Sequence, residues 1–355
     1  MALLLERLSD GIGLHGPLAL PVASQVAAGR LSTSFDGDFQ SIMIRSALNR
    51  IFGMLVVMAL VVTIVFVIVR VTPGDPAAVM LGPDATATDI ASLRQRLGLD
   101  ASIPEQFVSY VGGVLRGDFG QSIFLNMPVT SALMQRAEPT FFLTIFSLAI
   151  ATLIALPVGV LSAYWRGSVF DQAATALAMF AASIPSFWLG LIFMQVFAVQ
   201  LGWFDTSGYG GPGASFGERM HHLVLPAVTL GLISSALITR FTRASMLDVL
   251  NDDYVRTARS KGMSEWRVVV KHALKNALIP ILTVIGLTAA LLVSGAIVTE
   301  TVFGLPGVGS LIVSAVLRRD YPLIQGALLV VAGLYVLVNF IIDMLYLVVD
   351  PRVRY

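Results

Sequence analysis

The chain has 355 residues, of which 56% are hydrophobic and 13% charged, with a net charge of +1 and no cysteine. Soluble domains carry about 25% charged residues, so a chain this poor in charge cannot cover its surface with polar side chains and must expose much of it to lipid. The small net charge excludes the concentrated basic face that nucleic acids require, and the lack of thiols excludes disulfides, thiolate metal sites and cysteine nucleophiles.

The N-terminal segment 1–42 differs in composition from the rest of the chain. Gly, Pro, Ser and Asp interrupt its apolar runs, and its most apolar stretch, from Gly16 to Ala28, contains prolines and lacks a basic lead-in. A signal peptide has both a basic start and an unbroken apolar centre. We therefore expect residues 1–42 to be a disordered extension, or sequence that precedes a start at Met43.

Six stretches of the chain are long and apolar enough to cross a membrane. A bilayer core about 30 Å thick is crossed by a helix of roughly 20 apolar residues. We therefore predict an all-α fold, a polytopic membrane protein with six transmembrane helices. In chain order the stretches are Ile51–Val69, Phe141–Tyr164, Ala173–Leu201, Leu223–Ile238 with an extension to Phe241, Ala277–Val298 and Leu323–Val349.

The distribution of Lys and Arg predicts the orientation, because short cytoplasmic loops carry an excess of both. With the N-terminus inside, the inner segments hold 15 of these residues and the short outer loops hold 3. We therefore expect both termini to be cytoplasmic. The chain then divides into a first helix (43–72), an extracytoplasmic loop (73–138), a five-helix core (139–349) with a cytoplasmic loop (240–276), and a cytoplasmic tail (350–355).

The extracytoplasmic loop is patterned rather than featureless. Apolar residues recur at helical spacing from Ile90 to Leu97, where Gly98 ends the pattern, and again from Pro104 to Leu115. Such spacing predicts short amphipathic helices on the outer rim. They either cap the bundle or form a docking surface for an external partner, and the spacing favours neither.

Prolines lie in or beside three of the spans, at Pro157, Pro185 and Pro226. We expect each of them to kink its helix. Trp188 follows shortly after the second of these prolines. It is either an anchor at the membrane interface or an aromatic residue that lines a pathway, and both interpretations stay open.

The cytoplasmic loop from Arg240 to Asn276 contains every lysine of the chain. A carboxylate at Asp252 or Asp253 is placed to cap a short helix over Tyr254–Ser260. Gly262 stands where a left-handed residue ends such a helix. The spacing predicts a short helix carried between two spans.

A second helix should follow in the same loop, capped by Ser264 and leading into the fifth span. The small residues Thr257, Ala258 and Gly262 permit another surface to approach the first helix closely. The simpler alternative is an ordinary basic loop that only sets the topology. Spacing alone favours that alternative.

Two carboxylates lie within or at the end of the last spans. Glu300, at the outer end of the fifth span, either caps the loop Gly304–Gly309 or contacts a substrate, and we favour the structural role. Asp343 lies inside the sixth span, where a charge is costly and must face the bundle interior or a partner subunit. Its position near the cytoplasmic end favours a structural pairing over a proton or substrate role.

The sequence shows no catalytic machinery. It lacks a GxxxxGK[ST] loop, an HExxH motif and a Gly-x-Ser-x-Gly elbow, and its four histidines form no plausible ligand set. We therefore expect no catalytic, cofactor-binding or metal-binding residues, and we predict that the chain is not an enzyme. Energy for any driven transport must come from another polypeptide or from an ion gradient.

One segment of the cytoplasmic loop resembles a known motif. Tyr254-Val-Arg-Thr-Ala-Arg-Ser-Lys-Gly262, followed by His272-Ala-Leu-Lys-Asn-Ala-Leu-Ile-Pro280, resembles the EAA loop of ABC importer membrane subunits, and more narrowly the dipeptide/oligopeptide/nickel permease family. Arg256-Thr257-Ala258 takes the place of Glu-Ala-Ala, and Lys275 stands where the general motif has Pro. Any role that needs the Glu is therefore in doubt.

Other segments agree with the same family in the same order, over residues 43–355. They are Arg70–Pro76, Gly117–Ser122, Ser183–Gly190, His222–Gly231, Glu300–Gly309, Asp343–Tyr346 and Asp350–Arg354. Each motif is weak by itself, whereas the ordered set is specific.

The resemblance implies a fold, partners and a mechanism. It implies the type I transmembrane fold of ABC importers in the bacterial cell membrane, a homologous second permease subunit, two cytosolic ATPases and an extracytoplasmic substrate-binding protein. The short helix would be a coupling helix seated in an ATPase groove. The residues carried over to that role are Tyr254, Arg256, Thr257, Ala258, Arg259, Lys261 and Gly262.

The implied function is one half of a pathway for short peptides. Import of a nickel chelate or of glutathione by the same kind of subunit is the alternative within the family. A gradient-driven secondary transporter is the alternative of another mechanism. Such a transporter usually has an internal repeat of spans and paired ionisable residues at mid-membrane, and neither is found in this sequence.

Overall fold

The computed structural model describes residues 48, 50–71, 75–82, 85–96 and 98–349. The predicted extension 1–42 and the tail 350–355 lie outside the described residues. Met54–Arg352 form one compact unit, and the account below concerns that unit. The described residues are mostly helical and contain no strand, only an isolated bridge between Gln121 and Pro128.

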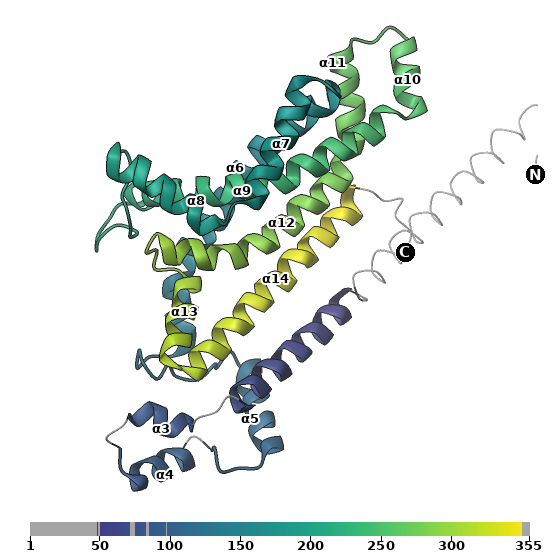
Figure 1. The fold of residues 1–355 in the computed structure, drawn as a ribbon. Coiled ribbons are helices and arrows are strands. Elements are labelled where there is room, and N and C mark those ends of the chain that lie inside the picture. Colours follow the sequence, from purple (N-terminus) through teal and green to yellow (C-terminus); the bar gives the residue numbers. More distant parts are fainter. Residues whose placement is uncertain (1–47, 49, 72–74, 83–84, 97, 350–355) are drawn as a thin grey trace, which may run out of the picture. The chain divides into compact units, whose positions relative to one another are not determined.

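Five helices in the described part of the chain are long and apolar enough to cross a membrane (Figure 1). A sixth crossing is formed if α7 (Val169–Ser183) and the helix that follows it, which together are bent by 100°, count as one span. The six predicted spans are thus present, the third in broken form. The five are Arg50–Val71, α6 (Val129–Tyr164), α9 (Phe216–Leu250), the continuous helix Glu265–Val302 and α14 (Tyr321–Val349).

Several spans are much longer than the sequence predicted. α6 has 36 residues and α9 has 35, which at 1.5 Å per residue gives each a length of about 53 Å. A bilayer core is only about 30 Å thick, so both helices project well beyond it. α9 ends at the loop 240–276, where α10 (Asp253–Ser260) turns back at the tip of the projecting part (Figure 1).

Only one of the three prolines predicted to kink a span interrupts its helix. α6 continues through Pro157 and α9 continues through Pro226, so a kink at either of these positions stays a prediction. Only Pro185 lies at a break, where Ile184 and Pro185 both have extended backbone angles between α7 and α8 (Ser186–Phe193). A residue before proline is pushed towards the extended region, and here the neighbouring helices do not hold the chain in α-helical form.

α6 and α9 pack closely along their length. Their backbones approach at two points, where a side chain would not fit. A Cβ atom at Gly231 would lie 2.9 Å from the backbone oxygen of Ser147, and one at Gly159 would lie 2.6 Å from Cβ of Thr242. These glycines therefore fix the pair at two widely separated levels.

The remaining helices are short. The outer segment contains α3 (Pro76–Leu81), α4 (Ala87–Arg96) and α5 (Ile103–Leu115), and the last two fall where the spacing predicts them. The sequence did not indicate α13 (Val308–Arg318). The other short elements are π-helical η1 (Met194–Gln200), α11 (Glu265–Arg267) and π-helical η2 (Val268–Ala273), which leads into α12 (Leu274–Val302).

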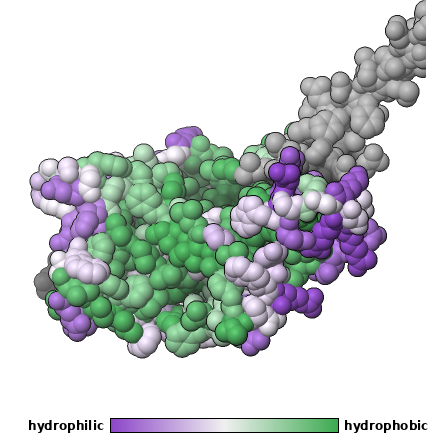
Figure 2. Space-filling view, turned by 90° about the horizontal axis from the view of Figure 1, so that it is seen from above, coloured by the Kyte–Doolittle hydropathy of each residue, from purple (hydrophilic) through white to green (hydrophobic). Residues whose placement is uncertain are grey.

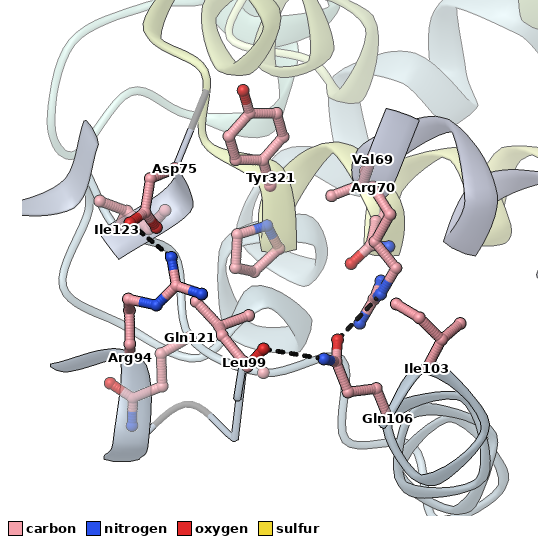
Figure 3. A pocket seen from close by; sticks show the side chains of 13 residues that line it. Val69, Arg70, Asp75, Arg94, Leu99, Ile103, Gln106, Gln121, Ile123 and Tyr321 are labelled. Atoms are coloured by element: carbon pink, nitrogen blue, oxygen red, sulfur yellow. Dashed lines mark hydrogen bonds and ion pairs between the residues drawn. The ribbon is translucent and has the colours of Figure 1, made fainter. Parts of the chain in front are cut away.

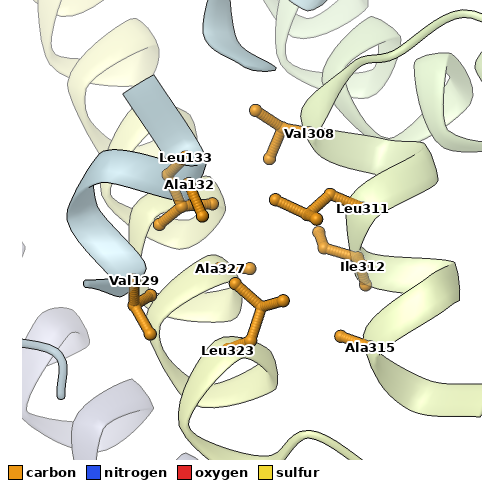
Figure 4. Packing of buried hydrophobic residues seen from close by; sticks show 9 residues of the cluster. All are labelled: Val129, Ala132, Leu133, Val308, Leu311, Ile312, Ala315, Leu323 and Ala327. Carbon is orange, nitrogen blue, oxygen red and sulfur yellow. The ribbon is translucent and has the colours of Figure 1, made fainter. Parts of the chain in front are cut away.

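Buried apolar residues form several clusters. One cluster joins the N-terminal turns of α6 to α13 and to the start of α14 (Figure 4). Its members come from α6 and from the neighbouring helices α13 and α14, which lie far from α6 in sequence, so the cluster anchors α13 to the bundle. The cluster consists of Val129, Ala132, Leu133, Val308, Leu311, Ile312, Ala315, Leu323 and Ala327.

The face shown in Figure 2 is largely apolar, with polar residues gathered towards its two ends. Large exposed apolar side chains occur on the long helices, including Leu153 at 74% and Leu177 at 66% exposure. This distribution is the one expected of helices solvated by lipid tails or covered by another membrane chain.

Candidate functional site

The loop 240–276, which the sequence predicts to be cytoplasmic, contains a short helix seated on the base of the following span. α10 rests on that base through Val255 and Ala258, which are buried together with Val268. Most other side chains of α10 are exposed. The helix is therefore fixed on one face and accessible on the other.

Gly262 ends α10 in the way that its position predicts. Its φ is +75°, its N–H donates to the oxygen of Arg259 at 2.9 Å, and the N–H of Met263 donates to the oxygen of Ala258 at 3.4 Å. This pair of bonds is a Schellman motif, which satisfies carbonyl groups at a helix end. Met263 also packs against the buried face of the helix.

Side-chain bonds hold both ends of α10 to the next helix. Arg259 donates to both carboxylate oxygens of Glu265, at 3.0 Å and 3.4 Å. The Tyr254 hydroxyl accepts from Nδ2 of Asn276 at 2.7 Å and donates to the oxygen of His272 at 3.5 Å. These bonds tie α10 to the start of the next helix and to the base of α12.

The capping predictions were only partly right. Asp252 and Ser264 occupy the N-cap positions of α10 and α11, but neither side chain makes the expected capping hydrogen bond. The prediction that Ala258 lies open to another surface is wrong, because Ala258 is on the face that packs against Val268. Thr257 and Gly262 are exposed as expected.

The outward face of α10 is basic. Arg256 is 71% exposed and lies 3.6 Å from Asp253, itself almost fully exposed, so this ion pair contributes little stability. Lys261 is exposed at the end of the helix. Both cations are available to an acidic partner surface.

An ion pair beside this region was not indicated by the sequence. Asp171, at the start of α7, is 3% exposed and accepts from Nε and NH2 of Arg243 at 2.6 Å and 2.8 Å. It also accepts from the Ser162 hydroxyl and from the N–H of Gly167. The carboxylate thus joins the ends of α6 and α7 to α9.

Glu300 makes contacts of the kind that the favoured structural role requires. Its carboxylate is fully buried and accepts from the Thr140 hydroxyl at 2.5 Å and from the N–H of Ser310 at 2.9 Å. The Thr140 oxygen in turn accepts from the N–H of Val308 at 2.9 Å. Glu300 therefore caps α13 and ties it to α6.

Replacing Glu300 with alanine should loosen the start of α13. Each buried donor left without an acceptor costs roughly 1–3 kcal/mol, so we expect amide hydrogen exchange at Ser310 to rise at least tenfold. Mass spectrometry of peptides covering residues 304–312 measures this change. Thr301→Ala, which removes only a helix-internal hydroxyl bond to Ile297, is the control, and equal exchange in both variants would contradict the capping role.

The outer segment is joined to the bundle around a cavity of about 540 Å³ (Figure 3). Arg70 donates to Gln106 at 3.0 Å, and Arg94 bridges Asp75 at 2.9 Å and Asp100 at 3.0 Å. The hydrogen bonds from Arg94 to these two carboxylates raise its pKa. Every charged side chain that lines the cavity therefore already has a hydrogen-bond partner within the protein. This is the arrangement expected of a structural contact between the outer segment and the bundle.

A second polar group lies at the outer ends of the spans. Glu138 of α6 pairs with Arg219 of α9 at 2.5 Å and accepts from the Tyr209 hydroxyl at 3.1 Å. Burial, with the hydrogen bond to Glu138 as a lesser cause, raises the pKa of Tyr209 to about 12. These bonds hold the loop between η1 and α9 against the bundle.

The other predicted site residues are separated from the cytoplasmic loop. Pro185 and Trp188 lie at the break in the third span, and both are exposed. The side chain of Asp343 lies outside the described part of the structure, so its predicted pairing remains a prediction. No three His, Asp or Glu side chains within the described ranges gather as a metal site requires.

Comparison with known proteins assigns the family. Residues 155–355 match the family described as the binding-protein-dependent transport system inner membrane component. Residues 43–144 match the N-terminal family of such membrane components. The chain belongs to the binding-protein-dependent transport permeases.

The chain matches curated relatives over nearly their whole length. The chain is 44% identical over 308 residues to a "Probable peptide ABC transporter permease protein" of Sinorhizobium fredii, covering 87% of this chain and 98% of the relative. It is 42% identical to a glutathione transport system permease protein of Pectobacterium atrosepticum, covering 88% and 100%. The corresponding Escherichia coli K12 protein is 41% identical over the same shares.

A solved structure supports the fold. The inward-facing MetNI methionine ABC transporter contains a chain similar to this one with a TM-score of 0.53 and 20% identity, covering 62% of this chain and 96% of that one. The protein is thus an ABC importer permease subunit, a multi-pass inner membrane protein with an all-α fold. Such a permease is a transport component, and it works with ATPase subunits and a second permease.

Proposed function

We propose that this permease forms half of the pathway for short peptides and couples to cytosolic ATPases through the loop 240–276. The coupling role rests on the position and packing of α10. It stands at the end of α9, beyond the length needed to cross a bilayer, with one face buried and the other exposed. Its bonds to α12 convert a push on α10 into a movement of a membrane span.

The exposed chemistry of α10 fits a groove with acidic residues. Arg256 and Lys261 offer cations, and Thr257 between them is small enough to allow close approach. Tyr254, Arg259, Ala258 and Gly262 set the position of the helix rather than contacting the partner. The excess of basic residues in the inner loops supports an orientation with both termini in the cytoplasm.

ATP drives transport in this proposal by biasing two arrangements of the bundle. The ATPases bind the coupling helices differently when ATP closes them, and this difference in binding free energy shifts the spans between inward-open and outward-open states. The complex contains this chain, a homologous second permease, two ATPases and an extracytoplasmic substrate-binding protein.

Short peptides are the substrate class that the relatives support. The relative with 44% identity is named for peptide transport, and those with 41–42% identity are named for transport of glutathione, which is itself a tripeptide. Glutathione import is therefore the second candidate. Both substrates present peptide groups, so one kind of pathway can serve either.

The test is purification of the tagged permease with its co-purifying chains, followed by reconstitution in liposomes. We expect a second permease and nucleotide-binding subunits by mass, and ATP-dependent uptake of a labelled dipeptide or tripeptide when the binding protein is added. Uptake of glutathione alone would favour the second candidate. Uptake by this chain alone without ATP would overturn the proposal in favour of a gradient-driven transporter.

A further inference from the structure

The third span is interrupted by non-helical backbone. α7 ends at Ser183 and α8 begins at Ser186, with Ile184 and Pro185 extended between them. No side chain caps α8, and the first N–H groups of a helix have no partners within that helix. The break therefore presents polar backbone groups that require hydrogen bonds from outside the two helices.

The break lies at membrane depth. Four residues separate Val169, where α7 begins, from the end of α6, and the charged pair of Asp171 with Arg243 marks this end of α7 as the membrane boundary. Its 15 residues span about 22 Å at 1.5 Å per residue. A hydrocarbon core is about 30 Å thick, which places Ser183 inside it. Irregular backbone at this depth is tolerated only where it is buried in protein or lines a water-filled cavity.

The described part of the chain does not bury the break. Ser183 and Pro185 are exposed, and the rings of Phe187 and Trp188 are 48% and 49% exposed. The opposite side of α8 is packed, since a Cβ atom at Gly190 would lie 3.1 Å from the ring of Phe303. The side of α8 that carries Trp188 therefore faces away from this subunit. Because the adjoining backbone is irregular, this side cannot be in contact with lipid tails.

We propose that the segment from Ser183 to Trp188 lines the water-filled translocation pathway and contacts the solute in transit. The inference rests on the proposed function and specifies its pathway. Water satisfies the free backbone groups between transport events, and the peptide groups of a substrate offer the same kinds of hydrogen bond. The rings of Phe187 and Trp188 provide apolar contacts that do not depend on one particular peptide side chain.

A cysteine accessibility experiment tests this assignment. The chain has no cysteine, so Ser183→Cys and Ser186→Cys each introduce its single thiol. The reconstituted complex is treated with a charged, membrane-impermeant methanethiosulfonate, and labelling of this chain is measured by mass. Leu153→Cys is the matched control, because Leu153 is 74% exposed on the unbroken helix α6 and lies at a comparable depth.

We expect the thiols at the break to react at least tenfold faster than the control, and bound substrate to slow their reaction. Reaction no faster than that of the control would overturn the assignment. Thiols that react in the isolated subunit but not in the complex would also overturn it, by assigning the break to the interface with the second permease. In either of these cases the pathway assignment fails, but normal ATP-dependent uptake by the wild-type protein leaves the proposed function intact.

Trp188 supplies a second readout. Trp188→Ala should raise the KM for peptide uptake fivefold or more while the partner subunits still co-purify, and Trp188→Phe should recover most of the loss. An unchanged KM for the alanine variant would contradict contact between this ring and the solute.

Discussion

Replacing Gly262 with valine should lower ATP-dependent uptake more than tenfold while the subunit still reaches the membrane. A β-branched residue held at a φ of +75° costs roughly 1–3 kcal/mol, so the Schellman motif at the end of α10 should open. Nothing lies within 4 Å of the added Cβ, so the effect arises from the backbone alone. Uptake in proteoliposomes and ATPase activity of the complex measure the loss of coupling.

Two control variants isolate this effect. Gly262→Asn should retain most uptake, because asparagine tolerates left-handed backbone. Gly98→Val introduces the same kind of strain, at a φ of +66° and also in open space, but in the outer segment, and should leave coupling intact. Normal uptake by Gly262→Val would remove the coupling role from α10.

The second large effect is expected at the buried ion pair. Asp171→Ala should destabilise the subunit by about 1.5–3 kcal/mol, because it removes charge-assisted hydrogen bonds, while Arg243, which is 30% exposed, stays partly hydrated. It also removes the acceptor of the Ser162 hydroxyl and of the Gly167 N–H. Thermal unfolding of the detergent-solubilised subunit should show a markedly lower midpoint.

A double variant distinguishes the stability lost when one residue of the ion pair is removed from the stability lost when both are replaced. Asp171→Leu with Arg243→Met should recover most of the lost stability, since a buried pair replaced by apolar residues is often close to neutral. Arg256→Ala, which breaks an exposed pair, should change stability by no more than about 0.5 kcal/mol. If the double variant lost as much stability as separate replacements of Asp171 and Arg243 together, the two residues would act independently.

Much of the fold and part of the site followed from local sequence. The apolar stretches predicted the spans because their length is set by the bilayer. Gly262 predicted the end of α10 because a left-handed residue is a strictly local requirement. The contacts of Glu300 agree with the structural alternative that its position at the outer end of the fifth span favoured, although its role stays a prediction.

The features that the sequence did not predict depend on contacts that cannot be recognised from a local stretch of sequence. Asp171 and Arg243 are 72 residues apart, and neither has a neighbour in sequence that reveals the other. Pro157, Pro185 and Pro226 read alike in sequence, yet only Pro185 interrupts its helix. Ala258 was assigned to the wrong face because the partner that buries it, Val268, lies beyond the turn at Gly262.

The close pairing of α6 with α9 gives this subunit the properties of a lever. Because the contacts at Gly231 and Gly159 hold the two helices at separate levels, they can tilt together more easily than they can bend or slide. A rigid rod of about 53 Å that tilts by about 10° around its midpoint displaces its two ends by about 4–5 Å in opposite directions. A push on the end of α9 next to α10 therefore displaces the opposite end of the pair in the reverse direction, which is the motion that the proposed alternation between inward-open and outward-open states requires.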